Sequence, residues 1–155
     1  MVASKIKQYL DDHETKYLSI NHSPAYTARE VASSAFVPRR EFAKSVIVDA
    51  DGEEIMVVVS ASRHVDLAAV AEASGAGNTR LATEEEFESR FPDCDVGAMP
   101  PFGNLYDMPV YMDEMVRAVD QICFNAGSHQ QIFRMECDDY VNLVSPRIGN
   151  FAVKE

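Results

Sequence analysis

The sequence has no tryptophan, few cysteines and no long hydrophobic run. Its longest apolar run, near residues 55–59, is far shorter than the roughly 20 residues that a membrane-spanning helix needs. The N-terminal residues also carry no apolar core of a secretory signal. We therefore expect a cytoplasmic protein with no membrane partner.

The familiar catalytic and metal-binding motifs are missing too. There is no GxSxG, HExxH, GxGxxG or P-loop pattern, and the four histidines are too scattered to suggest a metal site. Cys94, Cys123 and Cys137 have no CxxC spacing and no basic neighbour that would activate a thiolate. The sequence predicts reduced structural thiols, no metal and no cofactor.

Basic residues are scarce in comparison with acidic ones. The chain has 14 Lys and Arg against 25 Asp and Glu, which gives a formal net charge of −11. Neutralisation of phosphates normally supplies most of the affinity for nucleic acid, so this charge argues against a broad basic face. It leaves open a protein that grips only the end of a nucleic acid with a few side chains and backbone N–H groups.

The size and patterning of the chain indicate one compact domain over residues 1–155. Apolar spacing predicts an amphipathic helix over about 2–13, and alternation predicts a strand over 17–21. A capping-box pattern at Thr27 opens a short helix that ends before Pro38. Two β-branched runs, 42–50 and 53–61, are joined by Asp51-Gly52, a pair typical of a tight hairpin.

The second half alternates helices, loops and strands. Helices are expected after Asp66 and Thr83, and glycine and proline predict a loop-rich segment over 93–109. Further strands are expected at 110–112, 122–125 and 132–136, with a last helix at 138–144. Hairpins and helical connections together predict an α+β domain with a mixed β-sheet.

Three short patterns could carry chemistry, and each has an ordinary structural alternative. Lys44 interrupts an apolar strand, where it is either a cation pointing into a cleft or a solvated strand-end lysine. Residues 97–101 read GxxxP, in which glycine allows close backbone approach and proline adds stiffness, although the pattern also arises by chance. Residues 125–129 join two strands and could form no more than a hairpin turn.

These patterns occur in order with others, and the ordered set resembles a known family. The elements are His22 with Pro24 and Thr27, the run 42–48 around Lys44, residues 97–103, residues 110–113, and residues 124–128 before Asp139-Tyr140. Together they resemble the YbaK-like domain, also called the prolyl-tRNA-synthetase-associated domain, over about residues 22–146. The resemblance implies an α+β fold with a partly barrel-like mixed sheet and surrounding helices.

The same resemblance implies a function. Members of this family are aminoacyl-tRNA deacylases, trans-editing hydrolases that cleave the ester of a mischarged tRNA. The expected partners are the aminoacylated 3′ end of tRNA and an aminoacyl-tRNA synthetase. The resemblance makes Lys44 the catalytic residue, with water attack assisted by the substrate's ribose hydroxyl. It assigns substrate binding to His22, Gly97, Ala98, Met99, Pro100, Pro101, Asp113, Asn125, Ala126, Gly127 and Ser128.

Two features of the sequence keep alternatives open. Several family members have a histidine where this chain has Asn125, and His129 lies four residues further on. Asp113 either binds the substrate's α-ammonium group or caps a helix that begins before Met115. The competing functions are a non-catalytic module that binds nucleotide ends or a protein, and a hydrolase of another small aminoacyl ester.

Overall fold

The structure, a computed structural model, describes residues 4–21 and 38–154. Within these ranges the strands are β1 (Tyr17–Asn21), β2 (Ala43–Ala50), β3 (Glu53–Ser60), β4 (Arg63–Val65), β5 (Thr79–Leu81), β6 (Val110–Asp113), β7 (Gln121–Ser128), β8 (Gln131–Glu136), β9 (Arg147–Gly149) and β10 (Ala152–Lys154). The helices are α1 (Ser4–Asp12), α3 (Leu67–Ser74), α4 (Glu84–Phe87), α5 (Glu114–Arg117) and α6 (Cys137–Val144), with 3₁₀ turns η1 (Arg39–Glu41), η2 (Glu88–Arg90) and η3 (Gly103–Tyr106). The helix predicted after Thr27 lies outside the described residues.

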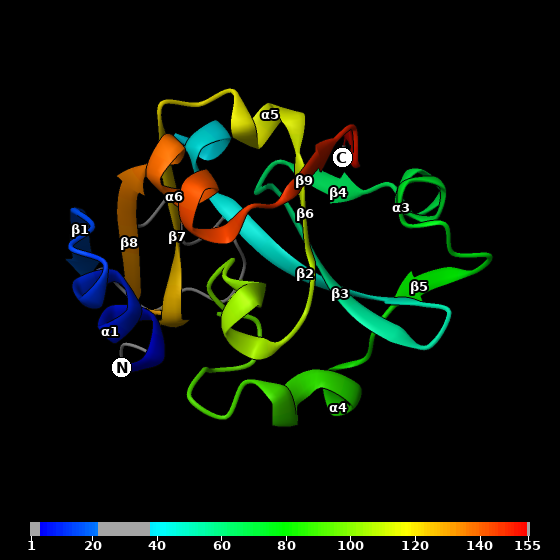
Figure 1. The fold of residues 1–155 in the computed structure, drawn as a ribbon, viewed down its shortest axis with the longest axis horizontal. Coiled ribbons are helices and arrows are strands. Elements are labelled where there is room, and N and C mark those ends of the chain that lie inside the picture. Colours follow the sequence, from blue (N-terminus) through cyan, green and yellow to red (C-terminus); the bar gives the residue numbers. More distant parts are fainter. Residues whose placement is uncertain (1–3, 22–37, 155) are drawn as a thin grey trace.

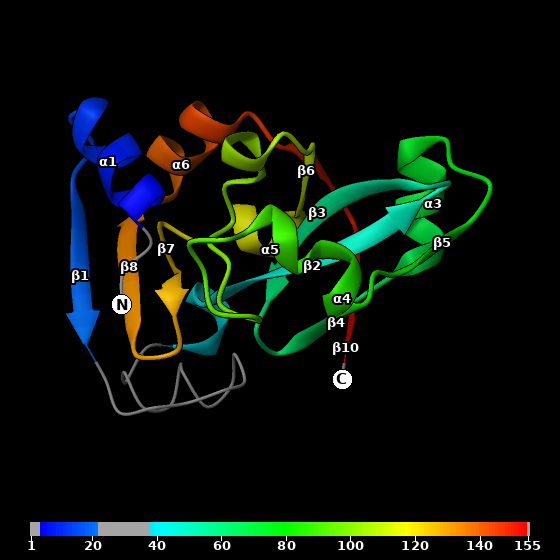
Figure 2. The same ribbon diagram turned by 90° about the horizontal axis from the view of Figure 1, so that it is seen from below.

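The strands form three sheets in the part of the chain that the structure describes. The largest has the order β5-β2-β3-β6-β9, the second is β1-β8-β7, and β4 pairs with β10. In the largest sheet β2 and β3 are antiparallel, whereas β6 runs parallel to both β3 and β9. Figures 1 and 2 show β1, β8 and β7 side by side at one end of the molecule, with α3 and β5 at the other. The predicted α+β fold with a mixed sheet is confirmed.

The tight hairpin expected at Asp51-Gly52 is present between β2 and β3. Both turn residues have the positive φ that such a turn requires, 52° for Asp51 and 91° for Gly52. The two strands stay in register from the pair Ala50↔Glu53 to the pair Ala43↔Ser60. This hairpin therefore fixes the position of Lys44 relative to the rest of the sheet.

The five-stranded sheet separates two apolar clusters. Met56 and Val58 of β3 face a cluster that also contains residues from α1, α6, β7 and β8. Ile55, Val57 and Val59 alternate with them and face a second cluster beneath α3. Successive side chains of a strand point to opposite faces, so a strand buried on both sides reads as one continuous apolar run.

The predicted helices after Asp66 and Thr83 begin where their caps place them. The Asp66 carboxylate accepts a hydrogen bond from the N–H of Ala69 at 3.1 Å, and the Glu86 carboxylate accepts one from the N–H of Thr83 at 2.8 Å. The three-residue strands β4, β5, β9 and β10 were not predicted, because each exists only through pairing with a distant segment. Among the described residues, no helix is both long and apolar enough to cross a membrane.

Candidate active site

The loop that carries the GxxxP pattern is tied to an irregularity in β7. The pairing of β7 with β8 jumps from Asn125↔Ile132 to Ser128↔Gln131, which leaves Ala126 and Gly127 out of the ladder. A bulge of this kind frees backbone groups for other partners. The N–H of Gly127 donates to the carbonyl of Ala98 at 3.0 Å, and the Gly127 carbonyl accepts from the N–H of Asp95 at 2.8 Å. Two segments of the predicted site thus lie side by side.

Residues 125–128 are therefore not the simple hairpin turn that was the alternative interpretation. They form the last four residues of β7, and the turn to β8 follows at His129 and Gln130. Gly127 adopts a φ of 97°, which belongs to the region that favours glycine. Asn125 and Ser128 are buried polar residues at the two ends of the bulge, with 7% and 2% of their surface exposed.

His129 packs against the start of the same loop. Its Nε2 lies 2.8 Å from the carbonyl oxygen of Val96, and since a carbonyl only accepts, Nε2 carries the proton and donates. A Cβ on Gly97 would lie 3.5 Å from the Cε1 atom of His129. His129 thus supports the loop at its glycine.

The far end of the loop is held by a buried tyrosine. The hydroxyl of Tyr140 donates a hydrogen bond to the carbonyl of Pro101. Burial, and to a lesser extent the neighbouring Cys137, raises the pKa of Tyr140 well above its ordinary value, which keeps the hydroxyl protonated as a donor. Gly97 is exposed, whereas the next four residues, through Pro101, are buried. Gly97 is consequently the most accessible residue of the GxxxP loop, and Met99 also lines a pocket.

Lys44 is the second residue of β2, where it pairs with Val59 of β3. It is half-buried and lines a pocket of about 260 Å³. The other described residues that line this pocket are Val46, His64, Val65, Leu67 and Leu81. An apolar pocket with two nitrogen-bearing side chains is typical of a small-molecule or nucleotide site.

Ser45 lines a second pocket on the other side of β2, because consecutive strand residues point to opposite faces. This pocket has a volume of about 240 Å³ and also contains Gly97, Met99 and Glu84. The two pockets share Val46 and Leu81 among their lining residues, so they adjoin. Lys44 and the Gly97 loop therefore lie in neighbouring pockets rather than in a single one.

Asn125 lies next to the Lys44 region. Phe42 forms a parallel bridge with Cys123, so β2 begins alongside β7. Two residues further along the two strands are Lys44 and Asn125, which the alternation of side chains places on the same face. Within residues 4–21 and 38–154, the Asn125 Oδ1 is buried without a hydrogen-bond partner, and the same holds for Ser45 Oγ. An unsatisfied buried polar atom costs about 1–3 kcal/mol and needs an explanation, such as a ligand.

Ser45 was missed by the sequence reasoning, although a signal for it was present. It interrupts the apolar run 42–48 just as its neighbour Lys44 does. His64 and Leu81 left no comparable signal, since their short strands were not predicted. Leu81 is 55% exposed despite being a large apolar residue, and it stands between the two pockets.

Asp113 lies elsewhere and is engaged by the backbone. One carboxylate oxygen accepts from the N–H of Met115 at 3.1 Å, and the other accepts from the N–H of Phe151 at 2.8 Å. The residue is 1% exposed. This geometry favours the helix-cap alternative, in which Asp113 begins α5 and fixes the C-terminal segment. His22 lies outside the described residues.

The three cysteines are free, as the sequence predicted, and none is activated. Burial raises the pKa of both the Cys94 and Cys123 thiols to about 12. Burial also raises the pKa of Cys137. All three are therefore protonated near neutral pH and poor nucleophiles.

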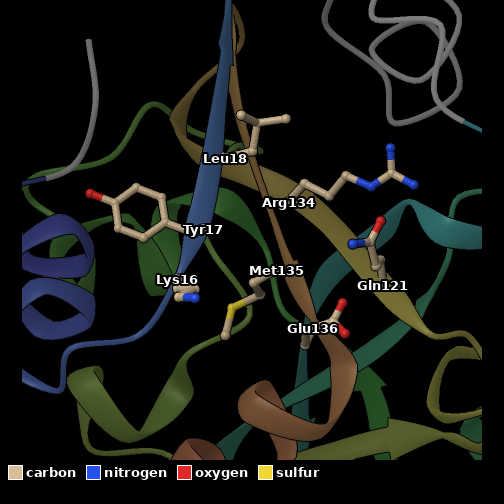
Figure 3. Close-up of a pocket in the computed structure, with 7 residues that line it drawn as sticks. All are labelled: Lys16, Tyr17, Leu18, Gln121, Arg134, Met135 and Glu136. Atoms are coloured by element: carbon tan, nitrogen blue, oxygen red, sulfur yellow. The ribbon is translucent and has the colours of Figure 1, made fainter.

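A larger pocket, of about 500 Å³, lies on the sheet formed by β1, β8 and β7. Figure 3 shows it lined by side chains from or next to these strands, among them Leu18 and Arg134. Among the described residues, none of the predicted site residues lines it. Arg134 is also tied to Glu41 of η1 at 2.8 Å. The volume of a pocket alone would therefore not have identified the predicted site residues.

Comparisons with known proteins identify the family of this chain. The family model of the aminoacyl-tRNA editing domain matches residues 22–143, so the chain belongs to that family. The matched region contains Lys44, the Gly97 loop and the β7 bulge. The predicted family resemblance is confirmed.

Individual relatives share a quarter or more of the aligned residues. The chain is 26% identical over 100 residues to the Multifunctional Ser/Thr-tRNA deacylase ProXp-y of Escherichia coli K12, which covers 64% of this chain and 59% of that protein. It is 28% identical over 118 residues to a Proline--tRNA ligase of Bacillus cytotoxicus, covering 76% of this chain and 19% of the ligase. The chain thus spans 59% of the first relative's length and a small part of the ligase.

A solved structure supports the fold. The crystal structure of a candidate trans-editing enzyme for prolyl-tRNA synthetase superimposes with a TM-score of 0.82 at 21% identity. The match covers 97% of this chain and 96% of the other. At this identity the likeness establishes the α+β architecture.

Proposed function

We propose that this chain is a trans-editing hydrolase that cleaves the ester bond between a wrongly attached amino acid and tRNA. The observation that carries the proposal is the pair of adjoining pockets on either side of β2, one with Lys44 and one with the Gly97 loop. An aminoacyl ester also has two unlike parts, a nucleotide and an amino acid. Two neighbouring pockets of different character suit such a substrate.

The Lys44 pocket takes the 3′-terminal nucleotide. Val46, Leu67 and Leu81 offer apolar surface for a base, while Lys44 offers a cation for phosphate or ester oxygen. The Ser45 pocket takes the amino acid, where Glu84 lies among the lining residues and suits the α-ammonium group. The ester bond then lies near Val46 and Leu81, where the two pockets meet.

Hydrolysis requires no protein nucleophile. The oxygen of a water molecule attacks the carbonyl carbon, the bond from that carbon to the ribose 3′ oxygen breaks, and a proton from the water passes to the 3′ oxygen. The neighbouring ribose hydroxyl positions the water. Lys44 and the N–H of Gly97 stabilise the negative charge that develops on the carbonyl oxygen. Ala98 does not serve, because its N–H donates to the carbonyl of Asp95 at 3.0 Å.

The amino acid is a small one with a hydroxyl group. Ser45 lines the pocket that takes the amino acid, and its unsatisfied Oγ would match a hydroxyl on the substrate side chain. The Escherichia coli relative is named as a Ser/Thr-tRNA deacylase. Seryl and threonyl esters are therefore the proposed substrates, and the synthetase that releases them is the proposed partner.

The test is a panel of tRNAs charged with serine, threonine, alanine or cysteine, measured for deacylation by the purified protein. Faster loss of seryl and threonyl esters than in buffer supports the proposal. Stable esters throughout, with tRNA still bound, would establish the non-catalytic module instead. Hydrolysis of aminoacyl esters that lack tRNA, at the same efficiency as the tRNA esters, would favour a hydrolase of small esters.

A further inference from the structure

Four cations lie on η1, β4 and β10 although the chain is acidic overall. We call Arg39, Arg40, Arg63 and Lys154 the cationic patch. Ser60 Oγ donates to the carbonyl of Arg39 at 3.2 Å, which holds η1 against the turn that leads to Arg63. Lys154 is the cross-strand partner of Arg63 in the pairing of β10 with β4. Figure 2 shows η1, β4 and the C-terminal end along the lower side of the molecule, whereas α1 lies at the upper side.

No ion pair among the residues that the structure describes neutralises the charges of this patch. The ion pairs among the described residues hold Lys7, Arg80, Arg90, Arg117 and Arg134. In residues 4–21 and 38–154 none of these pairs includes a member of the patch. Arg39, Arg40 and Lys154 are exposed, and Arg63 is half-buried.

Two acidic residues close to the patch in the sequence have partners elsewhere, and Glu155, which follows Lys154, lies outside the described residues. Glu41, which ends η1, pairs with Arg134 at 2.8 Å. Asp66, just after β4, accepts the N–H of Ala69 as a helix cap. The patch therefore presents positive charge to solvent in a protein whose formal net charge is −11.

The patch borders the pocket that contains Lys44. His64 follows Arg63 in β4, is exposed, and lines that pocket. Val65, the next residue, lines it as well. A bound polymer whose end enters the Lys44 pocket past His64 would therefore run alongside Arg63 and Lys154.

We propose that the cationic patch binds the phosphodiester backbone of the RNA strand whose 3′ end enters the Lys44 pocket. This rests on the proposed function, which makes that pocket the site of the terminal nucleotide. A local cluster of exposed cations attracts phosphates even when the net charge is unfavourable, because salt screens distant acidic residues more than adjacent cations. The patch orients the RNA, and the pockets select the ester.

The test measures binding rather than hydrolysis. The probe is an RNA microhelix with the acceptor stem of a tRNA and a single-stranded CCA end, followed by fluorescence anisotropy between about 50 and 200 mM salt. The double variant Arg40→Gln/Lys154→Gln removes two exposed cations, neither of which makes a side-chain hydrogen bond or ion pair within residues 4–21 and 38–154. We expect its Kd at low salt to rise roughly tenfold or more, and the slope of log K against log salt to flatten by about 1.4 to 1.8.

The matched control is Lys16→Gln, which removes an exposed cation next to β1 at the far end of the molecule. It should keep the wild-type affinity and salt slope, and the single variant Arg40→Gln should fall between the control and the double variant. An unchanged slope in the double variant, an equal effect of Lys16→Gln, or no binding of the microhelix by wild-type protein would each overturn the patch.

The outcome is separable from the fate of the proposed function. If the protein binds the microhelix through the patch but leaves every aminoacyl ester intact, the inference about the patch stands and the proposed hydrolase activity is wrong. If the protein hydrolyses the esters but the double variant binds RNA as tightly as wild type, the proposed hydrolase activity stands and the inference about the patch is wrong.

Discussion

The N–H of Gly127 donates a hydrogen bond to the carbonyl of Ala98 at 3.0 Å, joining the bulge of β7 to the GxxxP loop. This contact links two segments that are about 30 residues apart in the sequence. It depends on the irregular pairing after Asn125, since a regular strand would have used the Gly127 backbone in the ladder with β8. The position of the GxxxP loop is therefore fixed relative to β7.

Gly97→Ala should reduce activity by much more than it reduces stability. Gly97 has a φ of 85°, so alanine costs about 1–2 kcal/mol of strain or shifts the loop, although a Cβ meets only His129 at 3.5 Å. Misplacing the loop by about 1 Å is expected to lower deacylation on the order of 10²-fold. Single-turnover rates and thermal melting measure the two effects.

The control for this change is Gly52→Ala in the β2–β3 hairpin. Gly52 has a similar φ of 91° and open space around its Cα, so the backbone strain is comparable. It should lose the same stability and keep its rate per folded molecule. Equal loss of activity in both variants would mean that Gly97 matters only for folding.

Lys44→Ala should lower single-turnover deacylation by on the order of 10²-fold or more, because it removes a charge that stabilises the transition state. Lys44→Arg keeps the charge but adds a planar fork, so partial activity is expected. Thermal melting accompanies both measurements, and Lys16→Ala serves as the control cation. A folded Lys44→Ala protein with the wild-type rate would contradict the proposed mechanism.

Ser45→Ala should stabilise the protein and reduce its selectivity. The Ser45 Oγ is buried without a partner in the described part of the chain, so its removal should raise the free energy of unfolding by up to about 1 kcal/mol. The preference for seryl over alanyl ester should fall roughly tenfold, which corresponds to one hydrogen bond. Competing hydrolysis of the two esters provides the measurement.

Ser60→Ala is the comparison for this variant. Ser60 is a buried serine of the same sheet, whereas Ser45 is half-buried, and the Ser60 hydroxyl donates to the carbonyl of Arg39. It should destabilise the protein and leave the preference between esters unchanged. An unaltered serine preference in Ser45→Ala would exclude the hydroxyl from substrate selection.

Asp113→Asn should destabilise the protein without changing substrate affinity. The carboxylate accepts two backbone N–H groups, from Met115 and Phe151, and an amide can satisfy only one of them. We expect a loss of roughly 1–3 kcal/mol in the free energy of unfolding and an unchanged KM per folded molecule. A KM raised about tenfold with little loss of stability would instead support a contact with the α-ammonium group.

Serine at positions 94, 123 and 137, one at a time, should leave turnover per folded molecule intact. The thiols of Cys94 and Cys123 have pKa values of about 12 through burial, so neither forms a thiolate near neutral pH. A folded variant that loses all activity would reveal a thiol mechanism. Rates from pH 6 to 9, in steps of about one unit, should likewise show no inflection from a thiol.

The same pKa shifts predict how stability depends on pH. A thiol whose pKa is higher in the folded state than in the unfolded state favours folding while both forms are protonated, below about pH 9. As the pH rises from 9 towards 12, the unfolded thiols ionise first, and stability falls. Denaturant unfolding at pH 8 and 10, about one unit either side of the unfolded pKa, should show a smaller decrease in Cys123→Ser than in wild type.

Local chemistry in the sequence was enough to predict several elements. Asp51 and Gly52 tolerate positive φ, so the hairpin around them and the place of Lys44 on its first strand followed without tertiary information. Asp66 and Thr83 likewise predicted where two helices begin, because a cap is a contact within four residues. The order of the motifs further predicted the family and the expected active-site lysine, Lys44.

What the tertiary structure decided depends on contacts between distant residues. The sequence could not place Lys44 and Gly97 in adjoining pockets. Lys44 and Ser45 point to opposite faces of β2, and which segments cover each face depends on strand pairing that the sequence does not reveal. It left two roles open for Asp113, and the partner that favours the cap, Phe151, lies 38 residues away. The cationic patch also needs β10 to pair with β4, a long-range contact whose three-residue strands leave almost no local pattern.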